Sequence, residues 1–270
     1  MQPRKIRPIH GNDRHPVTLA IDIGGSGVKC MLLDRNGHKI SDRRRVETPR
    51  PATPLRVIAA IQGLIGRRTS FDRVAIGFPG WVENGVVRTA YNLHPNWVGF
   101  DLQTKMADIT DRPVRVINDA EAQGLGHIAG QGLEMMITFG TGVGSAVFVE
   151  GKVVPGLEIG QQLAGNGRTY DDLLNKIALR EIGVQHWRRR VQKMVLEIEP
   201  VWNYKRVYLG GGNARHLKQK QLPENALIVS NEGGLWGGHV LWENPDAVEW
   251  VNAARRGSER SNAKPAASAI

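Results

Sequence analysis

The sequence has a single cysteine, few aromatic residues and no long apolar segment. Cys30 stands alone among 270 residues, so the chain can form neither an intramolecular disulfide nor a zinc site built from several cysteines. This cysteine usage is typical of a reducing compartment, and we expect a cytoplasmic protein. No apolar run approaches the roughly 20 residues of a membrane span, and residues 1–16 lack the apolar stretch of a secretory signal. We therefore expect no membrane association.

Glycine and positive charge are abundant. Glycine accounts for 32 residues, about 12% against an average of roughly 7%, which favours tight turns and close approach of the backbone to a ligand. Lysine and arginine number 36 against 26 acidic residues, giving a net charge of +10 at pH 7. This excess suits a polyanionic partner, such as nucleic acid, an anionic membrane or polyphosphate, and equally a solubilising surface with basic tails.

Short apolar strands alternate with glycine turns and amphipathic helices, which predicts an α/β protein. We predict strands over residues 17–23, 28–33, 39–47, 74–78, 114–117, 135–139, 143–149, 206–209 and 227–229. We predict helices over residues 55–65, 102–109, 119–130, 170–182, 186–199 and 233–242.

A weak internal repeat suggests two related lobes. Residues 19–28 and 135–143 share a strand, a glycine turn and a second strand, although two glycine hairpins can also resemble each other by chance. We predict a basic tail over 1–16, a small N-terminal lobe over 17–118, a large C-terminal lobe over 119–245 and a flexible tail over 246–270.

Two glycine-rich turns are candidates for phosphate binding, because successive backbone N–H groups in such turns converge on an anion. A strand follows each turn, which excludes Walker A and Rossmann loops. One turn per lobe, facing a cleft, predicts a phosphotransferase, and plain hairpin turns are the alternative. Asp22 is placed to hold Mg²⁺ through water, and Lys29 to add a point charge. The residues assigned to phosphate binding here are Asp22, Gly24, Gly25, Ser26, Gly27, Lys29, Gly140, Thr141, Gly142 and Gly144.

Between the two turns, a buried strand ends at Asn118 and Asp119. A carboxylate at this position is a candidate catalytic group. The alternative is a helix N-cap, a role that Asn and Asp both favour.

These segments together resemble the ROK family of sugar kinases within the actin-like ATPase superfamily. The resemblance spans roughly residues 17–242 and rests on segments 22–25, 77–80, 92–97, 118–120, 140–145, 158–160 and 210–212. It implies an α/β fold of two actin-like, ribonuclease-H-like lobes with a cleft between them. Within the family, the first glycine turn is similar to that of the polyphosphate-using glucokinases, because Gly27 replaces the usual lysine and Lys29 follows.

The resemblance also implies a chemistry and a set of roles. Asp119 would take the proton from the 6-hydroxyl of glucose, and the phosphoryl donor would be inorganic polyphosphate, with ATP as an alternative donor. Mg²⁺ is the implied cofactor and a homodimer the implied assembly. Sugar contacts are implied for Gly80, Asn92, Asn118, Glu158 and Gln161, and a border of the far donor site for Gly211 and Gly212.

Two departures from the family pattern matter. Gln161 stands where relatives carry histidine; glutamine can donate and accept hydrogen bonds, which leaves the choice of hexose open. The zinc-binding cysteine cluster of many relatives is missing, as it is in the polyphosphate-using branch, so we expect no structural zinc.

Several alternatives therefore stand beside a glucokinase that forms glucose 6-phosphate. One is an ATP-dependent kinase of mannose or fructose, and another is a non-catalytic protein that binds sugar or a polyanion. A sugar-responsive repressor would need a winged helix, and we expect no DNA-binding domain in the residues before the first strand. The arginines at 43–45, 67–68 and 188–190 form either solvated surface or a track for polyphosphate, and Trp97 is the candidate for stacking on a sugar.

Overall fold

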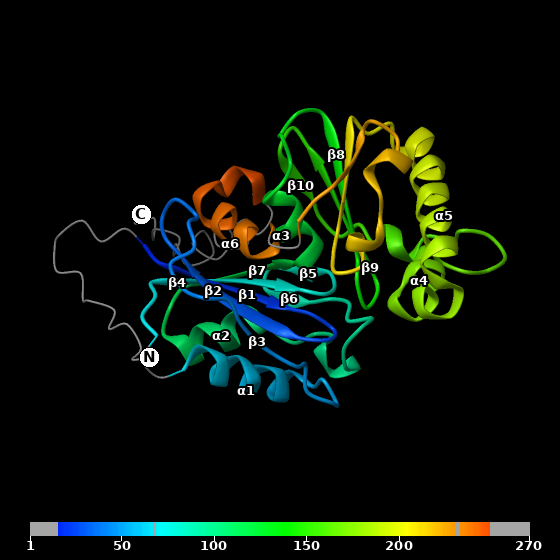
Figure 1. Ribbon diagram of the computed structural model, residues 1–270. Helices are drawn as coiled ribbons and strands as arrows, with labels where there is room; N and C mark the ends of the chain where they lie inside the picture. Colours follow the sequence, from blue (N-terminus) through cyan, green and yellow to red (C-terminus); the bar gives the residue numbers. More distant parts are fainter. Residues whose placement is uncertain (1–15, 67–68, 231–232, 249–270) are drawn as a thin grey trace, which may run out of the picture.

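A five-stranded mixed sheet forms the first lobe (Figure 1). The computed structural model describes residues 16–66, 69–230 and 233–248. The strand order is β3-β2-β1-β4-β7; β1, β4 and β7 run parallel, and β2 is antiparallel to both its neighbours. The strands are β1 (Thr18–Ile23), β2 (Val28–Leu33), β3 (Arg44–Val46), β4 (Arg73–Phe78) and β7 (Val114–Asn118). Helices α1 (Pro54–Ile65) and α2 (Leu102–Thr110) cover one face.

The second lobe repeats this order as β10-β9-β8-β11-β12. When the strands of each sheet are counted in chain order, both sheets have the spatial order third, second, first, fourth, fifth. In both, the fourth strand runs parallel to the first. The strands are β8 (Leu133–Phe139), β9 (Val143–Val149), β10 (Lys152–Val154), β11 (Arg206–Gly210) and β12 (Ala226–Ile228). The predicted repeat and the expected α/β fold of two actin-like lobes are therefore confirmed.

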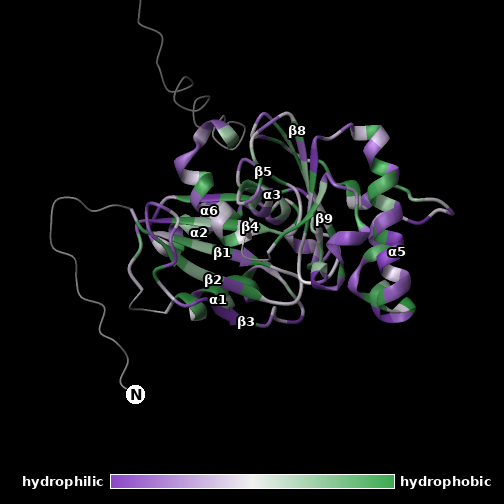
Figure 2. Cartoon of the chain, turned by 45° about the horizontal axis from the view of Figure 1, so that its top comes forward, coloured by the Kyte–Doolittle hydropathy of each residue, from purple (hydrophilic) through white to green (hydrophobic). Residues whose placement is uncertain are grey.

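The remaining elements connect or cover the two sheets. Figure 1 shows α4 and α5 along the outer side of the second lobe, and α3 and α6 between the lobes. Figure 2 shows hydrophobic residues concentrated in the strands and hydrophilic residues along much of α5. These elements are β5 (Val82–Glu83), β6 (Val86–Val87), α3 (Asp119–Leu125), α4 (Tyr170–Leu174), α5 (Lys176–Trp202) and α6 (Gly233–Glu243).

Each lobe has its own core built around one tryptophan. Trp97 and Trp187 are both fully buried, and their indole N–H groups donate to the carbonyls of Ala52 at 2.8 Å and Leu174 at 2.9 Å. Each indole packs on a phenylalanine that ends a central strand, Phe78 for Trp97 and Phe139 for Trp187. The prediction that Trp97 stacks on a sugar is therefore wrong, because its ring has no exposed face.

Three predicted elements need correction. The strand predicted over 39–47 is reduced to β3, and the helix predicted over 119–130 ends at Leu125. The break predicted between residues 182 and 186 is present, since Gly183 has φ 75° inside α5. A second break before it was missed: the side chain of Asn175 accepts from the N–H of Ala178 and begins a new helix. The arginines at 67–68 lie outside the described residues.

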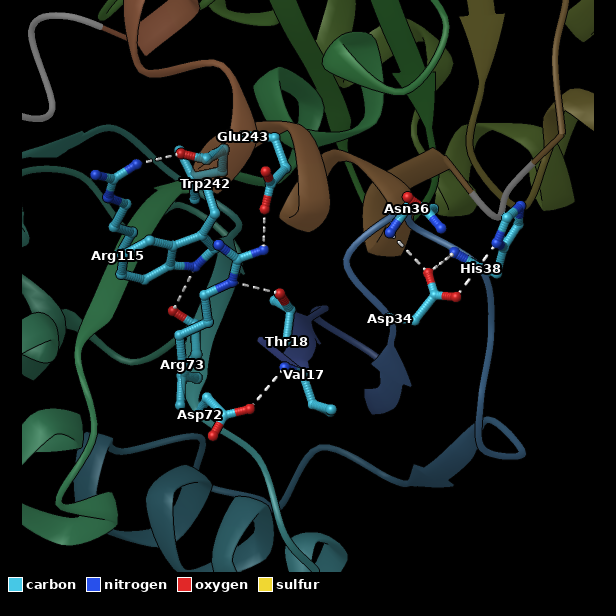
Figure 3. Close-up of polar contacts among 12 residues, drawn as sticks. Val17, Thr18, Asp34, Asn36, His38, Asp72, Arg73, Arg115, Trp242 and Glu243 are labelled. Atoms are coloured by element: carbon cyan, nitrogen blue, oxygen red, sulfur yellow. Dashed lines mark hydrogen bonds and ion pairs between the residues drawn. The ribbon is translucent and has the colours of Figure 1, made fainter. Parts of the chain in front are cut away.

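Helix α6 joins the second lobe to the first sheet. Its C-terminal end is fixed to β1 and β4: Arg73 bonds both Glu243 and Thr18 Oγ1, and the indole N–H of Trp242 donates to Val74 (Figure 3). The guanidinium of Arg115 lies 4.2 Å from the Trp242 ring centroid, within the range of a cation–π contact. Glycine lets the other face of α6 approach α3, since a Cβ on Gly237 would lie 1.7 Å from the carbonyl oxygen of Ala122.

None of the helices in the described ranges has the length and apolar character needed to cross a lipid bilayer.

Replacing Gly237 with alanine should separate α6 from α3, because the new methyl group meets backbone that cannot rotate away. We expect a loss of about 1–3 kcal/mol in the free energy of unfolding. Gly63→Ala on α1 is the matched control, because a Cβ there meets nothing within 4 Å and should stabilise the helix by up to about 1 kcal/mol. Denaturant unfolding measures both variants, and equal stability of the two would contradict this packing.

Candidate active site

A cavity of about 430 Å³ opens between the two lobes. It receives residues from the ends of β1, β4 and β7 in the first lobe and of β8, β9 and β11 in the second. All predicted site residues line it, whereas their individual roles remain predictions. They are Asp22, Gly24, Gly25, Ser26, Gly27, Lys29, Gly80, Asn92, Asn118, Asp119, Gly140, Thr141, Gly142, Gly144, Glu158, Gln161, Gly211 and Gly212.

The first glycine turn, residues 24–27 between β1 and β2, has its carbonyl groups fixed by side chains. The carbonyls of residues 24, 25 and 26 accept, in that order, from Thr48 at 2.5 Å, Arg50 at 2.8 Å and Arg45 at 3.2 Å. In a planar trans peptide the N–H points opposite to the preceding C=O. The N–H groups of residues 25–27 therefore point away from these three donors, as an anion-binding turn requires.

The second glycine turn, residues 140–144 between β8 and β9, is held by side chains that occupy one of its carbonyls and one of its N–H groups. Asn213 Nδ2 donates to the carbonyl of Gly140 at 3.1 Å, and Asp171 Oδ1 accepts from the N–H of Val143 at 2.6 Å. The two turns meet across the cavity, where the hydroxyls of Ser26 and Thr141 lie 2.8 Å apart. The lobes thus bring the two glycine turns that are predicted to bind phosphate to one place.

Asp22 and Lys29 form an ion pair at the edge of the cavity. They are register partners on β1 and β2, and Lys29 Nζ lies 2.6 Å from Asp22 Oδ2. The sequence assigned Lys29 to phosphate and Asp22 to a magnesium ion. The pair shows that each group already balances the charge of the other.

The junction of β7 and α3 positions Asp119. Asn118 is the N-cap of α3: its Oδ1 accepts from the N–H groups of Ala120 and Glu121, and its Nδ2 donates to the carbonyl of Gly80 at 3.1 Å. Because Asn118 performs the capping, the alternative interpretation of Asp119 as the N-cap is wrong. The buried amide of Asn118 is occupied by these protein contacts.

Carboxyl groups cluster around this junction: Glu121 is buried, and Asp119 and Glu158 are partly exposed to the cavity. Desolvation raises the pKa of Asp119 to about 8, and the charges of Asp22 and Glu158 add to this effect. Burial likewise raises the pKa of Glu121 to about 8, while desolvation and the charge of Asp171 raise that of Glu158 to about 7. Such shifts place a carboxyl group in the range where it can exchange a proton near neutral pH.

The side of the cavity for which the resemblance predicts sugar contacts is built from loops of both lobes. Glu158 precedes and Gln161 ends a short 3₁₀ helix whose Ile159 N–H donates to Ser145 Oγ at 2.8 Å. Asn92 lies against the second glycine turn, because a Cβ on Gly142 would fall 2.6 Å from its Nδ2. Gly80 also lacks space for a side chain, because a Cβ at this position would lie 2.1 Å from the carbonyl oxygen of Thr89.

Sequence reasoning missed several residues of this cavity. Arg45, Tyr91, Lys176 and Arg215 also line it. Arg45 belongs to the arginine group at 43–45 that the sequence analysis names. Successive side chains of a strand point to opposite faces, so this alternation could have separated Arg45 from its neighbours in sequence. Tyr91 is next to the predicted Asn92. Lys176 and Arg215 come from distant segments and have no local motif.

The described residues contain no group of three or more histidine, cysteine or acidic side chains placed to hold a metal ion. Mg²⁺ often needs no such group, since it is held by one or two carboxylates together with water and substrate phosphates. Asp22 is a carboxylate beside both glycine turns and fits that mode of binding.

Comparison with known proteins gives consistent matches. The sequence model of the ROK family matches residues 18–163. A polyphosphate glucokinase from Mycobacterium tuberculosis (strain ATCC 25618 / H37Rv) is 32% identical over 213 residues, which cover 75% of this chain and 80% of the relative.

Solved structures agree with the fold. Inorganic polyphosphate/ATP-glucomannokinase from Arthrobacter sp. strain KM superposes with a TM-score of 0.76 and 28% identity, covering 88% of this chain and 99% of the other. A ROK family glucokinase from Streptomyces griseus, in complex with glucose and AMPPNP, has a TM-score of 0.71 at 18% identity, covering 83% and 98%. The second match supports the fold alone.

The raised pKa of Asp119 makes stability depend on pH. Between its ordinary value of 3.8 and about 8, the folded state keeps a proton that the unfolded chain has lost, so the free energy of unfolding falls as pH rises through this window. Asp119→Asn removes the buried charge. We expect the variant to match wild type near pH 5 and to be more stable than wild type at pH 9.

Thermal or denaturant unfolding at the two pH values measures this difference. Asp108→Asn, at an exposed position on α2, is the control and should give the same difference from wild type at both values. If Asp119→Asn shows no gain in stability at pH 9 relative to pH 5, the charge at residue 119 is not desolvated.

Proposed function

The chain belongs to the ROK family, and from this premise we propose that it transfers the terminal phosphoryl group of inorganic polyphosphate to the 6-hydroxyl of glucose. The observation that carries the proposal is the meeting of two anion-binding turns, one from each lobe, beside the carboxyl of Asp119. The Mycobacterium tuberculosis and Arthrobacter relatives are named for polyphosphate, and the basic residues of the cavity suit a polyanionic donor.

The proposed step is a direct transfer. The sugar oxygen O6 forms a bond to the terminal phosphorus as the bond from phosphorus to the next bridging oxygen breaks, and the donor leaves one phosphate shorter. Asp119 accepts the O6 proton, a role that suits a carboxyl whose pKa lies near the working pH. In a loose phosphoryl-transfer transition state the base mainly positions the hydroxyl and accepts its proton late.

Backbone N–H groups of both glycine turns would hold the donor phosphates, and Gly211 and Gly212 border the same space. Arg45, Lys176 and Arg215 add positive charge along the cavity wall. Asp22 would hold Mg²⁺ together with the donor, and the ion would neutralise charge that develops on the phosphates. Glu158, Gln161 and Asn92 would bind the sugar hydroxyls.

ATP is the alternative donor, since glycine turns bind the phosphates of either molecule. Mannose is a second candidate acceptor, because Gln161 replaces the histidine of relatives and the Arthrobacter structure is of a glucomannokinase. The homodimer and the cytoplasmic location remain predictions from the resemblance and from cysteine usage.

Formation of glucose 6-phosphate tests the proposal directly. Wild type and Asp119→Asn are each given glucose, Mg²⁺ and either long-chain polyphosphate or ATP. We expect wild type to turn over with polyphosphate, and the variant to be slower by a factor of about 10²–10⁴, because the proton acceptor is lost.

Each other result has a distinct meaning. Turnover with ATP alone would keep the sugar-kinase chemistry and contradict polyphosphate as donor. Turnover only after glucose is replaced by mannose or fructose would contradict the proposed acceptor and point to Gln161. No turnover with any of these hexoses and either donor would contradict a catalytic role and favour a protein that binds sugar or polyanion.

A further inference from the structure

A second groove lies on the outer face of α5, apart from the active-site cavity. Its volume is about 480 Å³, and it is lined by Ile182, His186, Arg189, Arg190 and Lys193. None of these residues lines the cavity between the lobes. We call this feature the α5 groove.

The α5 groove is basic because of helical periodicity. Residues 186, 189, 190 and 193 have the spacing i, i+3, i+4, i+7, which puts all four side chains on one face of a helix. The opposite face of this part of α5 packs Trp187, Val191 and Met194 into the second-lobe core. We call these four side chains the basic stripe. Because another face of the helix is buried, the helix cannot rotate and the stripe stays toward solvent.

Acidic side chains do little to neutralise the stripe. Lys193 pairs with Glu197 at 3.5 Å in an exposed contact, which is weak in water. Arg190 donates to a backbone carbonyl, that of Leu173. In the described part of the chain, Arg189 and His186 have no carboxylate partner. Like charges three or four residues apart on a helix repel one another, so a bound polyanion would relieve this repulsion.

The same helix connects the groove to the active site. Helix α5 begins at Lys176, which lines the cavity, and continues past the bend at Gly183 to the stripe. Arg188 fixes α5 to the turn that carries Arg215, another cavity residue, by donating to the carbonyl of His216. Cationic side chains thus occur on both sides of the bend at Gly183, at the cavity and in the groove.

We propose that the α5 groove binds the distal phosphates of a linear inorganic polyphosphate whose terminal phosphate lies in the active-site cavity. The stripe from residue 186 to residue 193 is about 10 Å long at 1.5 Å per residue, so it spans several phosphates of such a chain. Lys176 at the cavity and His186 in the groove are separated by the bend in α5, and we expect tripolyphosphate, with three phosphates, to occupy one of the two places only. The groove would therefore give the protein a preference for long donors.

The proposal rests on the proposed function for the occupant of the cavity, but its test measures binding and not transfer. Long-chain polyphosphate and tripolyphosphate are titrated separately into the full-length protein by calorimetry, without sugar. The groove variant is Arg189→Glu/Lys193→Glu, at two exposed positions. The control is Lys105→Glu/Lys152→Glu, also at two exposed positions, which changes the net charge equally.

We expect the groove variant to bind long-chain polyphosphate at least about tenfold more weakly than wild type at moderate salt, because two phosphate contacts are lost. Binding of tripolyphosphate should stay unchanged, and the control variant should bind both ligands nearly as wild type does. Circular dichroism checks that both variants keep the helical content of wild type.

Several results would overturn the proposal. Long-chain polyphosphate binding that is unchanged in the groove variant, or equally weakened in the control, would reduce the groove to part of the general surface charge. If the groove bound single-stranded DNA more tightly than polyphosphate, polyphosphate would be the wrong occupant. If no donor supports turnover while the groove variant still loses polyphosphate binding, the proposed function fails and this inference stands.

Discussion

The structure depends on holding the carboxyl of Asp119 among other acidic side chains where the two lobes meet. Desolvation of Asp119 is unfavourable for its charged form, and the fold must keep the side chain there despite that cost. Asn118 does so by capping α3 and bonding the Gly80 carbonyl, while Glu121 bonds back to the Asn118 N–H. The helix behind Asp119 is in turn fixed by α6, whose glycine contacts leave no space between the backbones. The position of Asp119 is therefore a consequence of backbone packing.

The duplicated topology explains why the two glycine turns face each other. In each sheet a glycine turn joins the first two strands of the same five-strand order. Because the sheets lie on either side of α3 and α6, the two turns approach from opposite sides, and Ser26 and Thr141 meet. The same arrangement leaves the outer side of the second lobe to α5, whose basic stripe faces away from the core. Positive charge is thereby placed both inside the cleft and along one helix outside it.

The sequence predicts features that depend on local pattern, and it fails where distant segments decide the outcome. The glycine turns and the strand end at Asp119 are local, and the structure brings all of them to one cavity. Trp97 was a stacking candidate because it follows Asn92, but packing against Phe78 buries it completely. Lys176 and Arg215 reach the cavity only through the folding of the second lobe. The break at Asn175 was missed because its capping role depends on one side-chain bond to Ala178.

The most direct test of this account is the pKa of Asp119, read from the ¹³C shift of its side-chain carboxyl in aspartate-labelled protein. Comparison with Asp119→Asn assigns the signal. The account predicts a midpoint of about 8 for the protein without substrates, as expected for a carboxyl that is desolvated and surrounded by like charges. A midpoint near the ordinary value of 3.8 would show that water reaches this group freely. It would contradict the claim that the meeting of the lobes prepares Asp119 to accept a proton near neutral pH.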